Sequence, residues 1–242
     1  MGNVSAALKV VVIGNETWAL SSGFGIDFPT ASGASVRRQT STITPSNADT
    51  IVIQNEALTL TPFLGFVATP NDQWFVQSFA QFVIPVSDNS YSYQSINHFD
   101  ELPGLPPFTL VDRGALNVQS LLHLDVSFGR MLLDNSASND RLQSIAALFE
   151  IHYTTTLEDS DNVSFTDPNF QTHPVFNPQG VVDGNLGSLG NPAGRQDFLN
   201  LTFGVDVALF ATNIRPAFVL PIRTGDDKQF DCEFTLQVNR HF

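Results

Sequence analysis

The C-terminal segment of the chain alternates between apolar and polar side chains with a period of two. Apolar side chains stand at every second position from Phe230 to Val238 and again at Phe242, with Arg240 between them. The intervening positions carry acidic, hydroxyl, amide and imidazole groups. Because successive side chains of a strand point to opposite faces, this pattern predicts an amphipathic β-strand that ends on an aromatic residue.

The same period recurs in eight earlier segments, so the sequence predicts an all-β fold of about nine or ten strands and no helix. Several of these segments have 12 residues or more, whereas strands of globular proteins usually have about five or six. The predicted strands cover residues 4–13, 17–28, 56–68, 73–86, 118–133, 142–157, 198–210, 214–223 and 229–242.

The connections between these strands alternate in length along the chain. Tight turns, such as Thr69–Asp72, alternate with long polar segments at about residues 29–54, 87–116 and 158–196. We expect these three segments to be surface loops. Long loops at one end and tight turns at the other are typical of an antiparallel up-and-down membrane barrel. A Greek-key sandwich has no reason to alternate so regularly.

The composition agrees with a sheet that faces lipid on one side and water on the other. Charged residues make up 14% of the chain, against about 25% in soluble domains. No apolar run approaches the roughly 20 residues of a spanning helix. In lipid no water can satisfy an open sheet edge, so a spanning sheet has to close. We therefore predict one transmembrane β-barrel domain over residues 1–242; the alternative is a secreted or surface-attached soluble β-sandwich used for binding or assembly.

The odd number of strands has a consequence for the barrel. If the last strand ends on the periplasmic side, the first strand begins on the long-loop side, whereas single-chain bacterial barrels normally have an even number of strands. We expect that at least one strand is missing at the N-terminal side, or that the true count is ten. No signal peptide is visible near the N-terminus, so a targeting segment is expected to have been removed or to lie upstream.

Six blocks of the sequence share one resemblance: Val4–Lys9, Trp18–Pro29, Glu56–Trp74, Glu150–Thr156 (Glu-Ile-His-Tyr-Thr-Thr-Thr), Leu199–Thr202 and Pro221–Phe242. They resemble an uncharacterised, planctomycete-type family of porin-like outer-membrane β-barrel proteins. The resemblance covers most of the chain outside its long loops, and it implies further barrel N-terminal to Gly2, so that this chain is the C-terminal portion of a larger barrel. It implies no activity and no ligand.

The end of the chain also resembles the C-terminal signal of outer-membrane proteins, which the barrel-insertion machinery reads. The residues that carry this resemblance are Phe234, Leu236, Val238 and the terminal Phe242. It implies a location in the bacterial outer membrane, with outer-membrane lipid and the insertion machinery as partners.

If the face that carries Phe242 meets lipid, the opposite face of each strand lines the interior. Charges on a lipid face cost roughly 2–4 kcal/mol near the midplane, and only Arg130 and Arg240 fall on the apolar face, both near strand ends where they can reach headgroups. The candidate lumen-facing residues are Lys9, His123, Asp125, Glu150, His152, Asp206, Arg215, Arg223, Asp231 and Glu233.

Two groups of these residues are predicted to come together. A hairpin folded about Ala137 places His123 near His152 and Asp125 near Glu150. Two imidazoles and two carboxylates can bind a transition metal, but an interior network of hydrogen bonds and salt bridges is the favoured interpretation, and no metal or cofactor is predicted. In the last hairpin, Arg215 and Arg223 are expected beside Asp231 and Glu233, either as a structural cluster or as a selectivity filter.

Other function classes find little support in the sequence. The net charge of −13 argues against nucleic acid as a partner, because its binding needs clustered cations. The single Cys232 excludes an intramolecular disulfide and a thiol zinc cluster. No catalytic motif is present, so no enzyme activity is predicted. The leading hypothesis is a porin-like channel for small solutes, or a structural surface barrel that self-associates.

Overall fold

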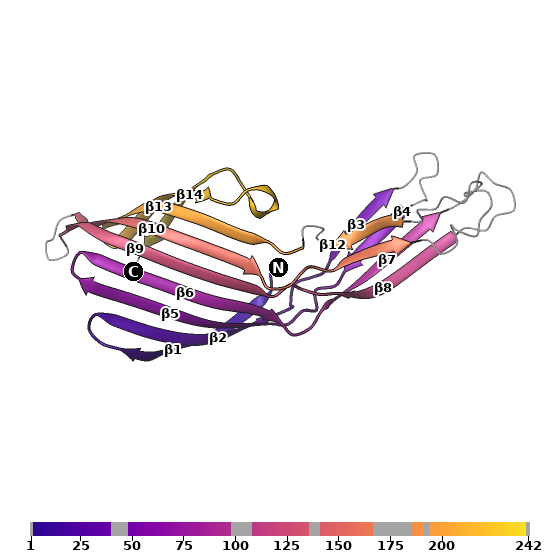
Figure 1. Ribbon diagram of the computed structural model, residues 1–242, viewed down its shortest axis with the longest axis horizontal. Coiled ribbons are helices and arrows are strands. Elements are labelled where there is room, and N and C mark those ends of the chain that lie inside the picture. The colour runs from indigo at the N-terminus through magenta and orange to yellow at the C-terminus, as the bar shows by residue number, and fades with distance from the viewer. Residues whose placement is uncertain are drawn as a thin grey trace.

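The computed structural model describes residues 2–39, 48–97, 108–135, 141–166, 185–190 and 194–240. Figure 1 shows an elongated molecule built of strands, with one large sheet in one half and smaller sheets in the other. In the described residues the one helical segment is the 3-10 turn Gly225–Asp227. None of the helical structure described is long and apolar enough to cross a membrane. The predicted all-β, antiparallel fold is confirmed.

The large sheet contains nine strands in an up-and-down order. Each strand pairs antiparallel with the one that precedes it in this sheet, as the nine alternating segments predict. The strands, in spatial order, are β1 (Val4–Gly14), β2 (Trp18–Phe28), β5 (Thr59–Asn71), β6 (Trp74–Pro85), β9 (Leu121–Asp134), β10 (Leu142–Thr156), β13 (Asp197–Leu209), β14 (Thr212–Pro221) and β15 (Glu233–Arg240). Among the described residues the sheet is open: β1 and β15 are its two edges.

Asparagine side chains shape the tight turns at one end of this sheet. Asn15 Oδ1 accepts hydrogen bonds from the backbone N–H groups of Thr17 (2.8 Å) and Trp18 (3.0 Å). Asn71 Oδ1 likewise accepts hydrogen bonds from the backbone N–H groups of Gln73 (2.9 Å) and Trp74 (3.0 Å). An Asn side chain that bonds the backbone two residues later stabilises a turn locally. We call this the tight-turn end, which also holds the β13–β14 turn, the end of β9 and the start of β10.

The described parts of the three segments predicted as long surface loops lie at the opposite end, which we call the long-connection end, and they contain strands where the sequence predicted loops. They form a four-stranded sheet and a separate hairpin, which extend beyond the large sheet in Figure 1. The four-stranded sheet has the order β3 (Ala34–Gln39), β4 (Ala48–Ile53), β7 (Asn89–Asn97) and β8 (Phe108–Leu116), and the hairpin pairs β11 (Asn162–Thr166) with β12 (Asn185–Gly190).

A small aromatic core joins the hairpin to the four-stranded sheet. Phe165 of β11 is 1% exposed and stacks on Tyr93 of β7 with ring centroids 4.2 Å apart. Tyr91 approaches the same ring edge-on, at 5.8 Å. These strands are short, and each contributes few apolar residues within Ser-, Thr- and Asn-rich sequence. Their stability depends on partners from other connections, which local periodicity does not reveal.

The register slides steadily across the large sheet. Directly opposed residues form one continuous row from the last residue of β1, Gly14, to the first residue of β15, Glu233. Measured against the strand ends, crossing nine strands therefore shifts the row by between the length of β15, which has 8 residues, and that of β1, which has 11 residues. This shift is roughly 23–33 Å. The row itself is eight spacings wide, roughly 38 Å. Its members are Gly14, Ala19, Val67, Gln77, Ser127, Glu150, Thr202, Val219 and Glu233.

Pairing also assigns every side chain to a face, because directly opposed residues of an antiparallel pair share a face. One face of the large sheet, the apolar face, carries aromatic and aliphatic residues that the structure leaves exposed. The other, the polar face, carries small, hydroxyl, amide and charged residues. Exposed members of the apolar face include Leu8, Phe24, Leu64, Phe82, Phe128, Phe203, Phe218, Phe234 and Leu236.

Candidate functional site

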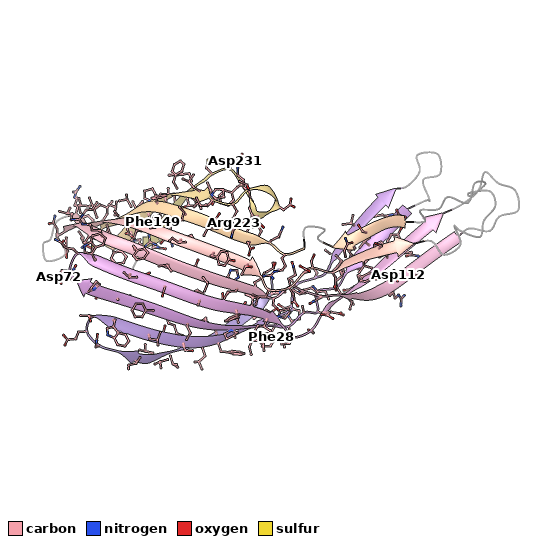
Figure 2. The ribbon with its side chains drawn as sticks, in the orientation of Figure 1. Phe28, Asp72, Asp112, Phe149, Arg223 and Asp231 are labelled. Carbon is pink, nitrogen blue, oxygen red and sulfur yellow. The ribbon has the colours of Figure 1, made fainter. Side chains whose placement is uncertain are left out.

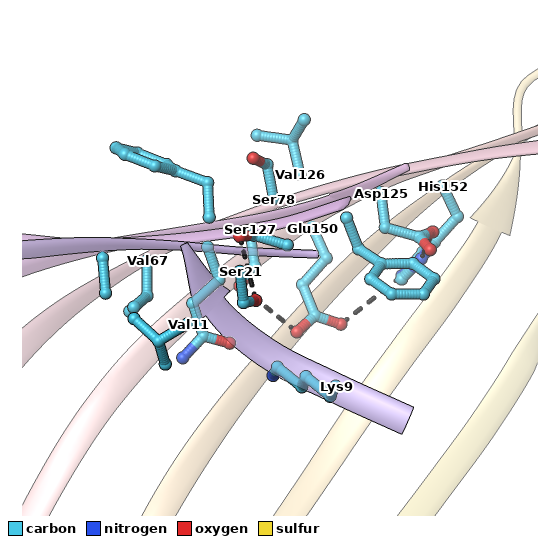
Figure 3. A pocket seen from close by; sticks show the side chains of 15 residues that line it. Lys9, Val11, Ser21, Val67, Ser78, Asp125, Val126, Ser127, Glu150 and His152 are labelled. Carbon is cyan, nitrogen blue, oxygen red and sulfur yellow. Dashed lines mark hydrogen bonds and ion pairs between the residues drawn. The ribbon is translucent and has the colours of Figure 1, made fainter. Parts of the chain in front are cut away.

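The polar face curls around a cavity of about 620 Å³. Lys9 of β1 and His152 of β10 both line it, although their strands are five spacings apart in the sheet and would be roughly 24 Å apart if the sheet were flat. The polar face is therefore the concave one. Figure 3 shows Lys9 on the strand that passes in front of Glu150.

His152 is held between two carboxylates on this face. Its Nδ1 lies 2.7 Å from Asp125 Oδ1, and its Nε2 lies 3.4 Å from Glu150 Oε2. Ser127 Oγ donates a hydrogen bond to Glu150 Oε1 at 3.3 Å. Asp125 and Ser127 alternate on β9, and Glu150 and His152 alternate on β10, so period two brings all four side chains to one face.

The β9–β10 register differs from the predicted one by two positions. His152 is opposite Asp125, and His123 is opposite Thr154, with His123 Nδ1 2.9 Å from Thr154 Oγ1. The predicted pairing of His123 with His152 is therefore wrong. The axis of the observed pairing lies one position later in the chain than the axis of the predicted pairing, and such a shift of a hairpin axis moves each partner by two.

This correction separates the two imidazoles. Within the described part of the chain, no group of three or more His, Cys, Asp or Glu side chains is arranged to hold a metal ion. The interaction that forms is a chain of hydrogen bonds and ion pairs between Asp125, His152, Glu150 and Ser127.

A second ion pair lies further along the polar face. The Nη2 and Nε atoms of Arg215 on β14 lie 2.6 Å and 3.0 Å from the same Oδ2 of Asp206 on β13. Asp206 is 16% exposed, so the guanidinium both neutralises and hydrogen-bonds a largely buried carboxylate. Both residues were predicted to face the interior, but not as partners.

The predicted cluster of Arg215 and Arg223 with Asp231 and Glu233 does not form. The connection from β14 to β15 runs over residues 222–232, so β15 begins at Glu233 rather than at Gln229. Arg223 and Asp231 lie in that connection, outside the sheet. Asp231 forms a salt bridge with Lys228, whose Nζ lies 2.6 Å from Asp231 Oδ1. The hydrogen bond and the charge of Lys228 hold the pKa of the Asp231 carboxyl below its usual range. Glu233 is opposite Val219.

Aromatic rings also lie on the polar face, and the sequence patterns do not identify them. Phe63 and Phe79 sit 5.5 Å apart by ring centroid. A Cβ added at Gly23 would overlap the ring of Phe63, and one added at Gly129 would overlap the ring of Phe75. These rings lie flat over glycines of the neighbouring strand. The detectable signal is a glycine in a strand, which marks a close approach by another group.

The residues that resemble an insertion signal lie on the apolar face of the edge strand β15. Phe234, Leu236 and Val238 are 61%, 61% and 58% exposed; Phe242 lies outside the described residues. Phe234 begins a row of opposed aromatic residues, with ring centroids 5.8 Å apart at Phe218–Phe234 and 5.0 Å apart at Phe149–Phe203. The row contains Phe234, Phe218, Phe203, Phe149 and Phe128.

At the long-connection end, Glu158 fixes the start of β9. Its Oε1 accepts a hydrogen bond from the backbone N–H of Ser120 at 2.9 Å. That bond, together with one from the Ser120 hydroxyl, lowers the pKa of Glu158. Figure 2 shows that this end of the large sheet adjoins the small sheets, whereas Asp72 marks the tight-turn end.

No protein-family model, no curated protein and no solved structure matches the chain.

Proposed function

We propose that this protein forms the wall of a porin-like β-barrel in a bacterial outer membrane, through which small polar solutes diffuse passively. The observation that carries the proposal is the separation of the two faces: the convex face of nine paired strands is apolar and exposed, and the concave face is polar. Soluble monomers rarely expose apolar patches beyond a few hundred Å², whereas a lipid-facing sheet needs such a surface.

The slide of the register supports the same proposal. A shift of roughly 23–33 Å over a width of roughly 38 Å corresponds to strands tilted by about 30–40° from the axis of a closed ring. Strands of membrane barrels tilt by about 35–45°. Strand lengths in the sheet run from 8 to 15 residues, and spanning a bilayer at such a tilt takes about 9–11.

Closure requires strands beyond these nine. Strands β1 and β15 run in the same direction, because an odd number of antiparallel strands separates the two ends of the series. They would pair parallel if they met directly. An antiparallel ring therefore takes an odd number of further strands between them, and lipid does not tolerate the two free edges.

A structural surface barrel with a filled interior is the second candidate. The rings of Phe63, Phe75 and Phe79 on the polar face and the chain of contacts around His152 favour it, because small barrels are filled by their own side chains. The porin-like proposal expects conductance, and the structural candidate expects none.

Reconstitution in planar bilayers tests these functions. The refolded protein is inserted from detergent, and the current is recorded under voltage, with empty detergent as the control. Stepwise conductance supports the channel. A folded, inserted protein that never conducts removes the channel and leaves the structural barrel. A stable monomer without detergent contradicts both and favours the soluble β-sandwich.

A further inference from the structure

Both tryptophans of the chain lie at the tight-turn end, on the apolar face. Trp18 is the first residue of β2, and Trp74 is the first residue of β6. Trp18 is opposite Ala68, and its ring lies 6.3 Å from that of Phe66. Indole groups favour the level of lipid headgroups, because one part of the ring is apolar and its N–H is polar.

Two arginines lie on the apolar face at the same end. Arg130 of β9 is opposite Trp74, with its guanidinium carbon 5.3 Å from the ring centroid. On its other side Arg130 is opposite Ala147, a small residue that leaves the guanidinium accessible. Arg240 is the last residue of β15. A cation on a lipid-facing surface costs roughly 2–4 kcal/mol at the bilayer midplane but only about 0–1 near the interface.

We propose that this rim binds the phosphate headgroups of membrane phospholipids, with Arg130 contacting the phosphate and both indoles at headgroup level. The inference rests on the proposed function and assigns the tight-turn end to the periplasmic leaflet, since tight turns of such barrels face the periplasm. A guanidinium matches phosphate in charge and in hydrogen-bonding geometry. Trp74 holds it in place through a cation–π contact.

Depth-dependent fluorescence quenching tests the position of the rim. The variants Trp18→Phe and Trp74→Phe each leave one tryptophan, and each is reconstituted with phospholipid brominated either near the headgroup or near the chain end. We expect the shallow bromine to quench both tryptophans about twofold more strongly than the deep one, because indoles settle at the interface.

Thermal unfolding in detergent tests the headgroup contact. Phosphatidylglycerol is expected to raise the Tm, and diacylglycerol with the same chains, which lacks phosphate, is expected to raise it less. Arg130→Gln should lose at least half of this difference and Arg130→Lys should retain most of it. The control Arg113→Gln removes one exposed arginine from β8, outside the large sheet, and should keep the whole difference. Inorganic phosphate at equal concentration should cause no shift.

The outcomes separate this inference from the proposed function. Stronger quenching by the deep bromine overturns the rim and leaves the membrane barrel standing. If Arg113→Gln and Arg130→Gln change the Tm difference between the two lipids equally, Arg130 does not contact the phosphate. If inorganic phosphate shifts the Tm, the lipid is not the partner. Absence of quenching at both depths overturns the membrane location, and the inference with it.

Discussion

At the scale of single residues, glycines decide how closely aromatic rings approach the wall of the large sheet. Gly129 of β9 is opposite Phe75, whose ring occupies the place where a Cβ would stand. Glycine costs backbone entropy in a strand, so its presence here is explained by this contact. The ring covers the neighbouring strand instead of projecting into the cavity.

Gly129→Ala should therefore destabilise the protein by about 1–3 kcal/mol, the range for overpacked sites. Gly2→Ala is the matched control, because no atom lies within 4 Å of a Cβ placed there, and it should change stability by no more than about 0.5 kcal/mol. Urea unfolding followed by tryptophan fluorescence measures both. Equal midpoints for the two variants would contradict the proposed contact.

Glu158 supplies a prediction about pH at the long-connection end. Its pKa is lowered in the folded protein, first by the backbone N–H of Ser120. A depressed carboxyl pKa means that the contact stabilises the fold at pH values above the ordinary Glu pKa of about 4.3 and is lost as the pH falls through the lower, folded value.

The amide resonance of Ser120 should report this titration by NMR. Its shift is expected to change with a midpoint below about 4.3, and Glu158→Gln should abolish the inflection while leaving the spectrum of the large sheet intact. A midpoint at or above the ordinary value would show that the carboxylate is not held by this amide.

At the scale of strands, adjacent residues of β1 provide a test of which face meets lipid. Leu8 is on the apolar face and 71% exposed; Ala7 is exposed on the polar face, opposite Gly25. In water, both positions should accept a charge with changes within about 0.5 kcal/mol.

In a bilayer, Leu8→Arg should cost roughly 2–4 kcal/mol and reduce insertion, because the guanidinium faces hydrocarbon. Ala7→Arg in the same strand should insert as the unmodified protein does. Folding into liposomes, followed by the electrophoretic shift of unheated samples, compares the two. Similar insertion of both variants would place the apolar face outside the lipid.

The strands of the large sheet were the most predictable elements. Nine segments with period two correspond to nine paired strands, because alternation is a local signal of a half-apolar strand. The six strands at the long-connection end were not predictable by the same means. Phe165 is buried only because Tyr91 and Tyr93, more than 70 residues away in the chain, provide its contacts.

At the scale of the whole molecule, the slide of the register sets the tilt of the strands. We expect about 30–40° between the strands and the membrane normal. Polarised infrared spectroscopy of the amide I band in oriented bilayers measures this angle. Strands parallel to the normal, or lying flat on the bilayer, would be incompatible with the register of the sheet inside a closed ring.

The candidate site shows where prediction from the sequence ends. The polar face of β9 and β10 was predictable, because it follows from alternation within each strand. The partners were not: His152 pairs with Asp125 and Glu150 rather than lying near His123, because a shift of the hairpin axis by one position moves every partner by two. Arg215 likewise pairs with Asp206, because a long connection removes Asp231 from the sheet.

The sequence by itself determined where the nine strands lie, apart from the end of β14 and the start of β15, and which face each paired side chain takes, since both depend on neighbours two positions apart. Only the tertiary structure decided the register, the tilt, the strands within the long connections and the two free edges. These depend on turn geometry and on contacts between distant segments, and each segment alone is compatible with several pairings. The rim of Trp18, Trp74 and Arg130 belongs to this second group, because it exists only once β2, β6 and β9 lie in their places in the sheet.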